Sequence, residues 1–415
     1  MPYTYFFAFL LLSFLPHSAA QGEVLKDEDL QNFFNQARGF LIACTQTQIQ
    51  LSPQTFVGLC KKFTDAATRL CVPIKGVAPL QLAASKLLEG RAKRTLTPID
   101  ADVLQLCLLA GTYSIAEKHV DGLHMYEVDP MNTCLTPMDF LRYWYYSGMV
   151  RCNLKQWGKA IDCFRIVISS PAHDVSAIVI ESYKKLCLTS LIEKGVKPTL
   201  PSYTENIVNR ALRTQARPYD AIVKKFEEDD AVGLEEEVKK AHDALLADKN
   251  LGLAKQAVKA LARRRMRRLT DCYITLSLED IAQQVGLANA DEALTQLLWL
   301  IKKGLIYATI DQSTRMVHFK DGDNISESAA ADALTVKLER SIEEVVDLAN
   351  RVQELDIQMS KNPKYIMKNS AGGDGRGPIG GASSVVFGLD GDDMGDEAIA
   401  ISESYGTDAF GGSMM

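Results

Sequence analysis

Residues 276–319 read as helix, turn, helix and β-hairpin, and this stretch constrains the fold of the chain more than any other. Ser277 precedes acidic residues, so a hydroxyl N-cap and carboxylates meet at the start of a first helix, and Gly286 ends that helix. A second helix with the same 3.6-residue apolar period follows a short turn. The period then changes to two, which predicts two strands over residues 307–310 and 316–319. The stretch is therefore predicted to be a winged helix.

The length and composition are those of a globular chain with more than one domain. The chain has 415 residues, which is room for about two or three domains. Its net charge of −6 is mild, and this argues against a dedicated nucleic-acid binder, whose domain is usually strongly basic. Its nine cysteines form no C-x-x-C pair, which indicates free thiols in a reducing compartment.

The first residues of the chain conflict with that compartment. An apolar run over residues 6–12 is followed by Ser18, Ala19 and Ala20, the apolar core and small-residue exit of a secretory signal. The run has no Lys or Arg before it and is too short to span a membrane. We assign residues 1–22 to an apolar, signal-like leader outside the fold.

Residues 23–213 read as a succession of paired helices. In one pair, Trp144 and Gly148 on the first helix and Ala160 and Phe164 on the second match the tetratricopeptide pattern. Such a pair cannot bury its apolar face alone and implies stacked neighbours. The predicted fold class is mostly α: a right-handed, tetratricopeptide-like helical solenoid, then a winged-helix domain, then a long C-terminal helix.

Residues 255–268 carry seven basic residues and no acid. Lys255, Lys259, Arg263 and Arg267 recur every four residues and form one charged row beside an apolar row. Two interpretations stay open. One is a nuclear-targeting or nucleic-acid-binding segment. The other, which we favour, is the solvated or partner-facing side of a helix that leads into the winged helix.

Residues 326–360 are predicted to form one long helix with an apolar seam. A seam of that size needs partner helices, so we expect it to dock into a helical bundle through Leu334, Leu338, Ile342, Val345, Leu348, Val352, Leu355 and Met359. Residues 361–415 are predicted to be a disordered tail because they are rich in Gly and acidic residues.

Sequence motifs that would carry chemistry are absent. There is no H-E-x-x-H, no H-x-H and no phosphate-binding G-x-x-x-x-G-K-[ST] loop. His119 and His124 are five residues apart, so on a helix they would diverge by about 140° and could not share a metal ion. We expect no catalytic, cofactor-binding or metal-binding residues and no cofactor.

Two segments carry a family resemblance: RPYDAIVKKFEEDD at residues 217–230, and YITLSLEDIAQQVGLANADEALTQLLWLIKKGLIYATID at residues 273–311. They resemble the PCI domain of the proteasome lid, signalosome and translation initiation factor three complexes. We place this domain at residues 214–325, with the winged helix at residues 276–319. Over residues 27–359 the chain most resembles the subunit-three family of the COP-nine signalosome.

The resemblance implies a non-catalytic scaffold subunit. The signalosome removes a ubiquitin-like modifier from the cullins of cullin-RING ubiquitin ligases, and a zinc metalloprotease subunit performs this deneddylation. The implied partners are other PCI subunits and the metalloprotease subunit, with no small-molecule substrate and no membrane. The implied location is the cytoplasm and nucleus, which conflicts with the signal-like leader.

The β-hairpin of the winged helix, residues 307–319, is the second expected interface, and we call it the wing. A two-stranded ribbon leaves unpaired backbone at its edge, so we expect it to pair with the wing of a neighbouring PCI subunit through Tyr307, Ile310, Met316, Val317 and Phe319.

Two other functions stay open from the sequence. One is a PCI subunit of the proteasome lid or of initiation factor three. The other is a winged-helix nucleic-acid binder whose second helix enters a major groove. Against the latter, Asp291 and Glu292 lie in the first turn of that helix, where they would repel phosphates.

Overall fold

The computed structural model describes residues 27–89, 95–121, 128, 133–171, 174–287, 289–320, 327–363 and 365–367. The predicted leader, residues 1–22, and the predicted tail from residue 368 onward lie outside the described residues. By internal contacts the chain divides into two units, residues 1–336 and 337–415, and each is described by itself.

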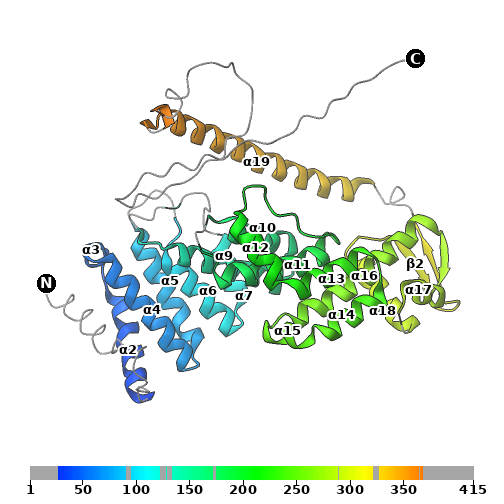
Figure 1. Cartoon of the computed structure of the whole chain (residues 1–415), viewed down its shortest axis with the longest axis horizontal. Helices are drawn as coiled ribbons and strands as arrows, with labels where there is room; N and C mark the ends of the chain where they lie inside the picture. The colour runs from blue at the N-terminus through cyan, green and yellow to red at the C-terminus, as the bar shows by residue number, and fades with distance from the viewer. Residues whose placement is uncertain are drawn as a thin grey trace. The chain divides into compact units, whose positions relative to one another are not determined.

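The first part of the chain is a row of helices, each packed on its neighbours in the sequence (Figure 1). Each helix of this row contributes to one continuous apolar core. This arrangement confirms the predicted helical repeats. The helices are α2 (Asp27–Ala43), α3 (Gln46–Leu51), α4 (Pro53–Arg69), α5 (Pro73–Leu88), α6 (Pro98–Ala110), α7 (Tyr113–Asp121), α9 (Pro137–Asn153), α10 (Trp157–Ser169), α11 (Ala177–Glu193) and α12 (Asn206–Gln215).

The tetratricopeptide-like pair is formed by α9 and α10, as predicted. Trp144, Ala160 and Phe164 are buried in the core. A Cβ atom built on Gly148 would lie 2.5 Å from Cε1 of Phe164. Only glycine therefore allows the two helices to approach this closely.

This contact predicts a large difference between two glycine substitutions. Gly148→Ala is expected to lower the free energy of unfolding by about 1–3 kcal/mol, because the new methyl group overpacks the Phe164 ring. Gly158→Ala on α10 is the matched control, since a Cβ there meets nothing within 4 Å. The control should leave stability unchanged or raise it by up to about 1 kcal/mol. Urea unfolding followed by circular dichroism measures both, and equal effects would contradict the close-packing role.

The core continues without a break into four further helices, α13 (Arg217–Glu227), α14 (Ala231–Lys240), α15 (His242–Ala247) and α16 (Leu251–Cys272). A buried polar chain ties them to the repeats. Lys185 on α11 donates to the Asn250 side-chain oxygen (2.7 Å), and the Asn250 amide donates to the Tyr219 hydroxyl (2.9 Å). The Tyr219 hydroxyl in turn donates to a carboxylate oxygen of Asp248 (2.8 Å). Breaking any link would strand a buried polar group, so this network fixes α16 against the repeats.

The winged helix follows α16 and has its own small core. It comprises β1 (Thr275–Ser277), α17 (Leu278–Val285), α18 (Ala290–Lys302), β2 (Ala308–Asp311) and β3 (Met316–Phe319). The predicted caps are confirmed: the Ser277 hydroxyl accepts from the Asp280 N–H, and Gly286 ends α17 at φ 84°. The winged helix lies at the yellow end of the helical row (Figure 1).

One part of the winged-helix prediction is wrong. The sheet has three strands in the order β1-β3-β2, so β3 is central and not an edge. Strand β1 was missed because three residues are too few to show a period of two, and only its pairing with β3 makes it a strand.

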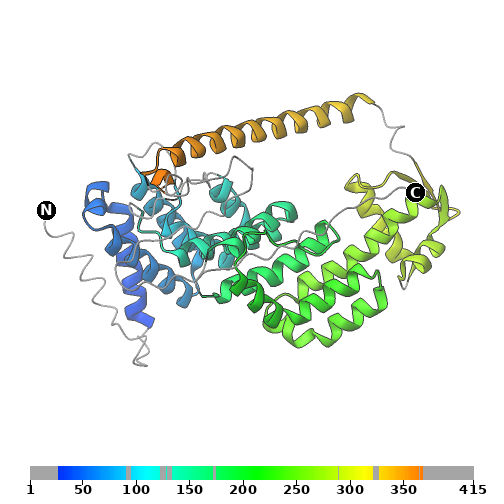
Figure 2. The same ribbon diagram turned by 45° about the horizontal axis from the view of Figure 1, so that its top comes forward.

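The long C-terminal helix is α19 (Glu327–Ser360), one uninterrupted helix of 34 residues (Figure 2). The sequence predicts a helix over residues 326–360, and α19 ends at the predicted residue and starts one residue later than predicted.

Candidate interaction surfaces

The free edge of the wing belongs to β2. The Lys320 N–H donates to the Tyr307 carbonyl oxygen (2.8 Å), and Thr309 pairs with His318 across β2 and β3. Backbone groups alternate in direction along an antiparallel strand. The N–H and C=O groups of Ala308 and Ile310 therefore point away from β3 and are free to pair with another strand.

The structure separates the five residues predicted for the wing interface. Val317 is fully buried in the central strand and pairs with Leu276 on one side and Ile310 on the other. It is a core residue of the sheet and has no surface to offer a partner, which corrects its place in the predicted set. Tyr307 is exposed, whereas Ile310 and Phe319 are partly buried against the winged-helix core and Met316 is half-buried.

The apolar seam of α19 is exposed along its length. Successive helical residues are rotated by about 100°, so the eight predicted positions fall within an arc of about 140° on one side. Leu334 has no described side chain, and the other seven are exposed: Leu338, Ile342, Val345, Leu348, Val352, Leu355 and Met359. A continuous apolar face of this kind marks an interaction surface.

The basic run of α16 is used largely within the chain. Arg265 binds the Asp229 carboxylate and backbone oxygen, and it donates to the Val285 carbonyl (3.0 Å) at the end of α17. Arg263 donates to the Gln296 side chain (2.8 Å) and stacks 3.6 Å above the Trp299 ring on α18. These contacts join α16 to the winged helix. Residues 255–268 thus lie in a helix that leads into that domain, as predicted, but part of their basic side faces the rest of the chain and not solvent or a partner.

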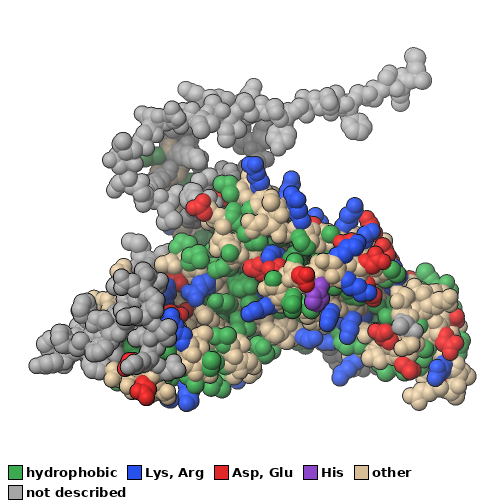
Figure 3. All heavy atoms as spheres, turned by 60° about the horizontal axis from the view of Figure 1, so that its bottom comes forward, with side chains coloured by type: hydrophobic (Ala, Val, Ile, Leu, Met, Phe, Trp, Pro, Cys, Tyr) green, Lys and Arg blue, Asp and Glu red, His purple; other side chains and the backbone are tan. Residues whose placement is uncertain are grey.

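The geometry of α18 is poorly suited to a nucleic-acid groove. Asp291 and Glu292 lie in its first turn and Lys302 in its last, the distribution that the helix dipole favours. Phosphates approaching the N-terminal half would meet carboxylates. On the face shown in Figure 3, basic side chains lie interspersed with acidic and hydrophobic ones.

The buried His119 pairs with a buried carboxylate. His119 Nε2 lies 2.8 Å from an Asp100 carboxylate oxygen in the core, and the other oxygen of Asp100 accepts from the Thr97 N–H and hydroxyl, capping α6. Across the described residues, His, Cys, Asp and Glu side chains nowhere gather in a group of three or more that could hold a metal ion. His124 lies outside the described residues.

The cysteines are all free, and most are buried or half-buried. Burial raises the pKa of Cys152 and of Cys187 to about 12 and that of Cys163 to about 11. These three thiols are therefore protonated near neutral pH and are poor nucleophiles. Their packing agrees with their interpretation as small apolar residues.

Comparison with known proteins gives two family matches. A profile described as COP9 signalosome complex subunit 3, N-terminal helical repeats, matches residues 9–208, and the PCI domain profile matches residues 238–321. The first match begins inside the predicted leader, so part of that stretch is similar to the family's helical repeats.

Two curated relatives cover most of the chain. The COP9 signalosome complex subunit 3 of Dictyostelium discoideum is 33% identical over 362 residues, which is 86% of this chain and 85% of the relative. That of Arabidopsis thaliana is 36% identical over 331 residues, 79% of this chain and 74% of the relative. No helix in the described part of the chain combines the length and apolar character that crossing a bilayer requires.

Proposed function

Because the chain belongs to the family of COP9 signalosome complex subunit 3, we propose that it is a non-catalytic scaffold subunit of that complex. The observation that carries the proposal is the exposed apolar face of α19. Monomeric soluble proteins rarely expose a contiguous apolar surface as large as these seven side chains form on one helix, so the face marks a binding surface. The complex, as the resemblance implies, removes a ubiquitin-like modifier from cullins. The chain then supplies binding surfaces and leaves the chemistry to a metalloprotease subunit.

Two surfaces, the α19 face and the outer edge of β2, bind other subunits. The α19 face docks in trans into a bundle with the helices of other subunits. The outer edge of β2 pairs with the wing of one neighbouring PCI subunit by strand addition. The first surface supplies apolar burial and the second supplies backbone hydrogen bonds, which fix register.

The partners we propose are those that the resemblance implies. They are other PCI subunits and the metalloprotease subunit, and through them cullin-RING ubiquitin ligases. The complex acts on cullins in the cytoplasm and nucleus, and we place the chain there. A role as a nucleic-acid binder is not favoured, because carboxylates occupy the first turn of α18.

The proposal predicts that the chain has no activity alone and is needed for assembly. The purified chain should release no ubiquitin-like modifier from a modified cullin, with or without added Zn²⁺. When it is added to the remaining purified subunits, size-exclusion chromatography should show one larger species that contains it. Modifier release by the chain alone, inhibited by a zinc chelator, would make it a catalytic component and contradict the proposal.

A further inference from the structure

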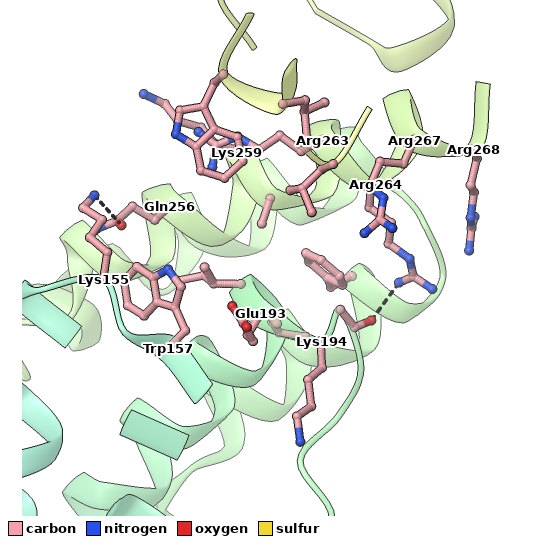
Figure 4. Close-up of a pocket in the computed structure, with 18 of the residues that line it drawn as sticks. Lys155, Trp157, Glu193, Lys194, Gln256, Lys259, Arg263, Arg264, Arg267 and Arg268 are labelled. Atoms are coloured by element: carbon pink, nitrogen blue, oxygen red, sulfur yellow. Dashed lines mark hydrogen bonds between the residues drawn. The ribbon is translucent and has the colours of Figure 1, made fainter. Parts of the chain in front are cut away.

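A cleft of about 600 Å³ lies between the end of the repeats and the winged helix. One wall comes from Lys155, Trp157 and the C-terminal turn of α11, and the other comes from α16 (Figure 4). Trp299 of α18 and Leu305 close one end. None of the assembly surfaces described above contributes to this cleft.

The cleft is strongly basic, although the chain as a whole has a net charge of −6. Lys155 and Lys194 lie on one wall. Five more cations lie on α16, namely Lys259, Arg263, Arg264, Arg267 and Arg268. The acidic lining residues are Glu193 and Asp271. This excess of positive charge favours an anionic occupant.

Several of these cations lack an anionic partner among the described residues. The side chains of Lys194, Lys259 and Arg267 are exposed, and no carboxylate of a described residue lies within the 4.0 Å of an ion pair. Arg263 is half-buried and binds a neutral amide and the Trp299 ring. Burial lowers the pKa of its guanidinium, which shows that this charge is desolvated without a carboxylate to offset the loss.

The cleft also has an apolar lining. Phe226, Leu191 and Leu300 are buried residues of its lining, and Trp157 on one wall and Trp299 at one end add indole rings. A bare phosphate cluster would leave this apolar surface unused. A peptide can present carboxylates and an apolar side chain together.

The spacing of the cations fits an extended peptide. Lys259, Arg263 and Arg267 are four residues apart on α16, so they succeed one another every 6 Å or so along the helix axis. Every second residue of an extended strand points the same way, at steps of about 6.6 Å. Alternate carboxylates of an extended segment can thus meet successive cations.

We propose that this cleft binds an extended acidic segment of a partner protein, with acidic residues at alternate positions and one apolar side chain against the apolar lining. Arg263 and Arg267 pair with two carboxylates of the segment, and Lys259 pairs with the next carboxylate along the segment. The bound segment touches the repeats, α16 and the winged helix at once, and so holds these elements together.

The test uses the full-length chain and a fluorescent synthetic peptide of about twelve residues, in which Glu alternates with Ala around one central Leu. Binding is measured by fluorescence anisotropy. Lys259→Glu with Arg267→Glu should weaken binding at least about tenfold, because two charge-assisted contacts become repulsive. Both side chains are exposed and unpaired within the described residues, so the fold should persist, as circular dichroism will show.

Lys75→Glu is the control, since Lys75 is exposed on α5, does not line the cleft, and lies on a helix that packs on other repeat helices and not on α16. It should change affinity less than about twofold, because exposed charges separated by more than a Debye length, about 8–10 Å, are largely screened. Two of the three tryptophans line the cleft, so the peptide should also shift tryptophan emission. A second peptide, with every Glu replaced by Gln, tests the need for charge. The proposal is overturned if this neutral peptide binds as well as the acidic one, or if the double variant binds like the control. It is also overturned if single-stranded RNA or inositol hexakisphosphate outcompetes the acidic peptide.

Discussion

A chain carrying Leu348→Glu and Val352→Glu is expected to stay out of the complex, with at least about a hundredfold loss of incorporation. These side chains are 50% and 59% exposed on α19, so the free chain tolerates charge there. In a bundle each would be buried, a contribution of about 1.5–3 kcal/mol per side chain that the substitution removes. Two unpaired buried carboxylates add a further desolvation cost. Co-precipitation with a tagged PCI subunit measures the effect.

The control comes from the same helix. Val336 and Ile357 are also apolar and exposed, but they lie about 130° or more from the centre of the seam. Val336→Glu with Ile357→Glu adds the same charge and should assemble normally.

Deleting everything after Gly322 should detach the chain, whereas deleting residues 371–415 should change little. Full incorporation of the seam variant, or of the chain cut after Gly322, would show that α19 packs only within its own subunit.

The second large effect is expected at the free edge of β2. Ile310→Pro removes an N–H that points away from β3, so the wing's own ladder stays intact. Loss of an outward donor should abolish strand addition and reduce binding to the neighbouring PCI subunit by at least about tenfold. The measurement is pairwise binding of the two purified subunits.

Thr309→Pro and Val317→Pro distinguish the outer edge from the inner ladder. The Thr309 N–H points toward His318, and Val317 lies fully buried in the central strand. Proline at either position should damage the winged helix itself, and amide hydrogen exchange in α17 and α18 will report this. If Ile310→Pro binds its neighbour normally while Thr309→Pro unfolds the wing, strand addition is not the contact.

Local signals in the sequence were enough to predict most of the fold. Ser277 and Gly286 mark the ends of α17 because capping and left-handed backbone depend on single residue types. Gly148 and Phe164 predict a helix pair because a close approach needs a residue without a side chain opposite a large one. The α19 seam is visible because its period holds for the length of the helix.

Features that depend on distant pairing were not predictable in the same way. Val317 looked like an edge residue because nothing local indicates that residues 275–277 return to pair with β3. The basic run gave only a charged row. The packing of α16 against the winged helix determines which contacts these side chains make. Arg263 stacks on Trp299, and Arg265 binds Asp229 and Val285. The cleft beside α16 likewise joins residues more than a hundred positions apart.

The scaffold role is tested most directly by affinity purification of the full-length chain from its own cells, with mass-spectrometric identification of the co-purifying chains. We expect a stoichiometric set of COP9 signalosome subunits that includes the metalloprotease, together with cullins, and loss of that set from the Leu348→Glu, Val352→Glu chain. Co-purification of proteasomal ATPases or of ribosomal initiation factors, without signalosome subunits, would contradict it.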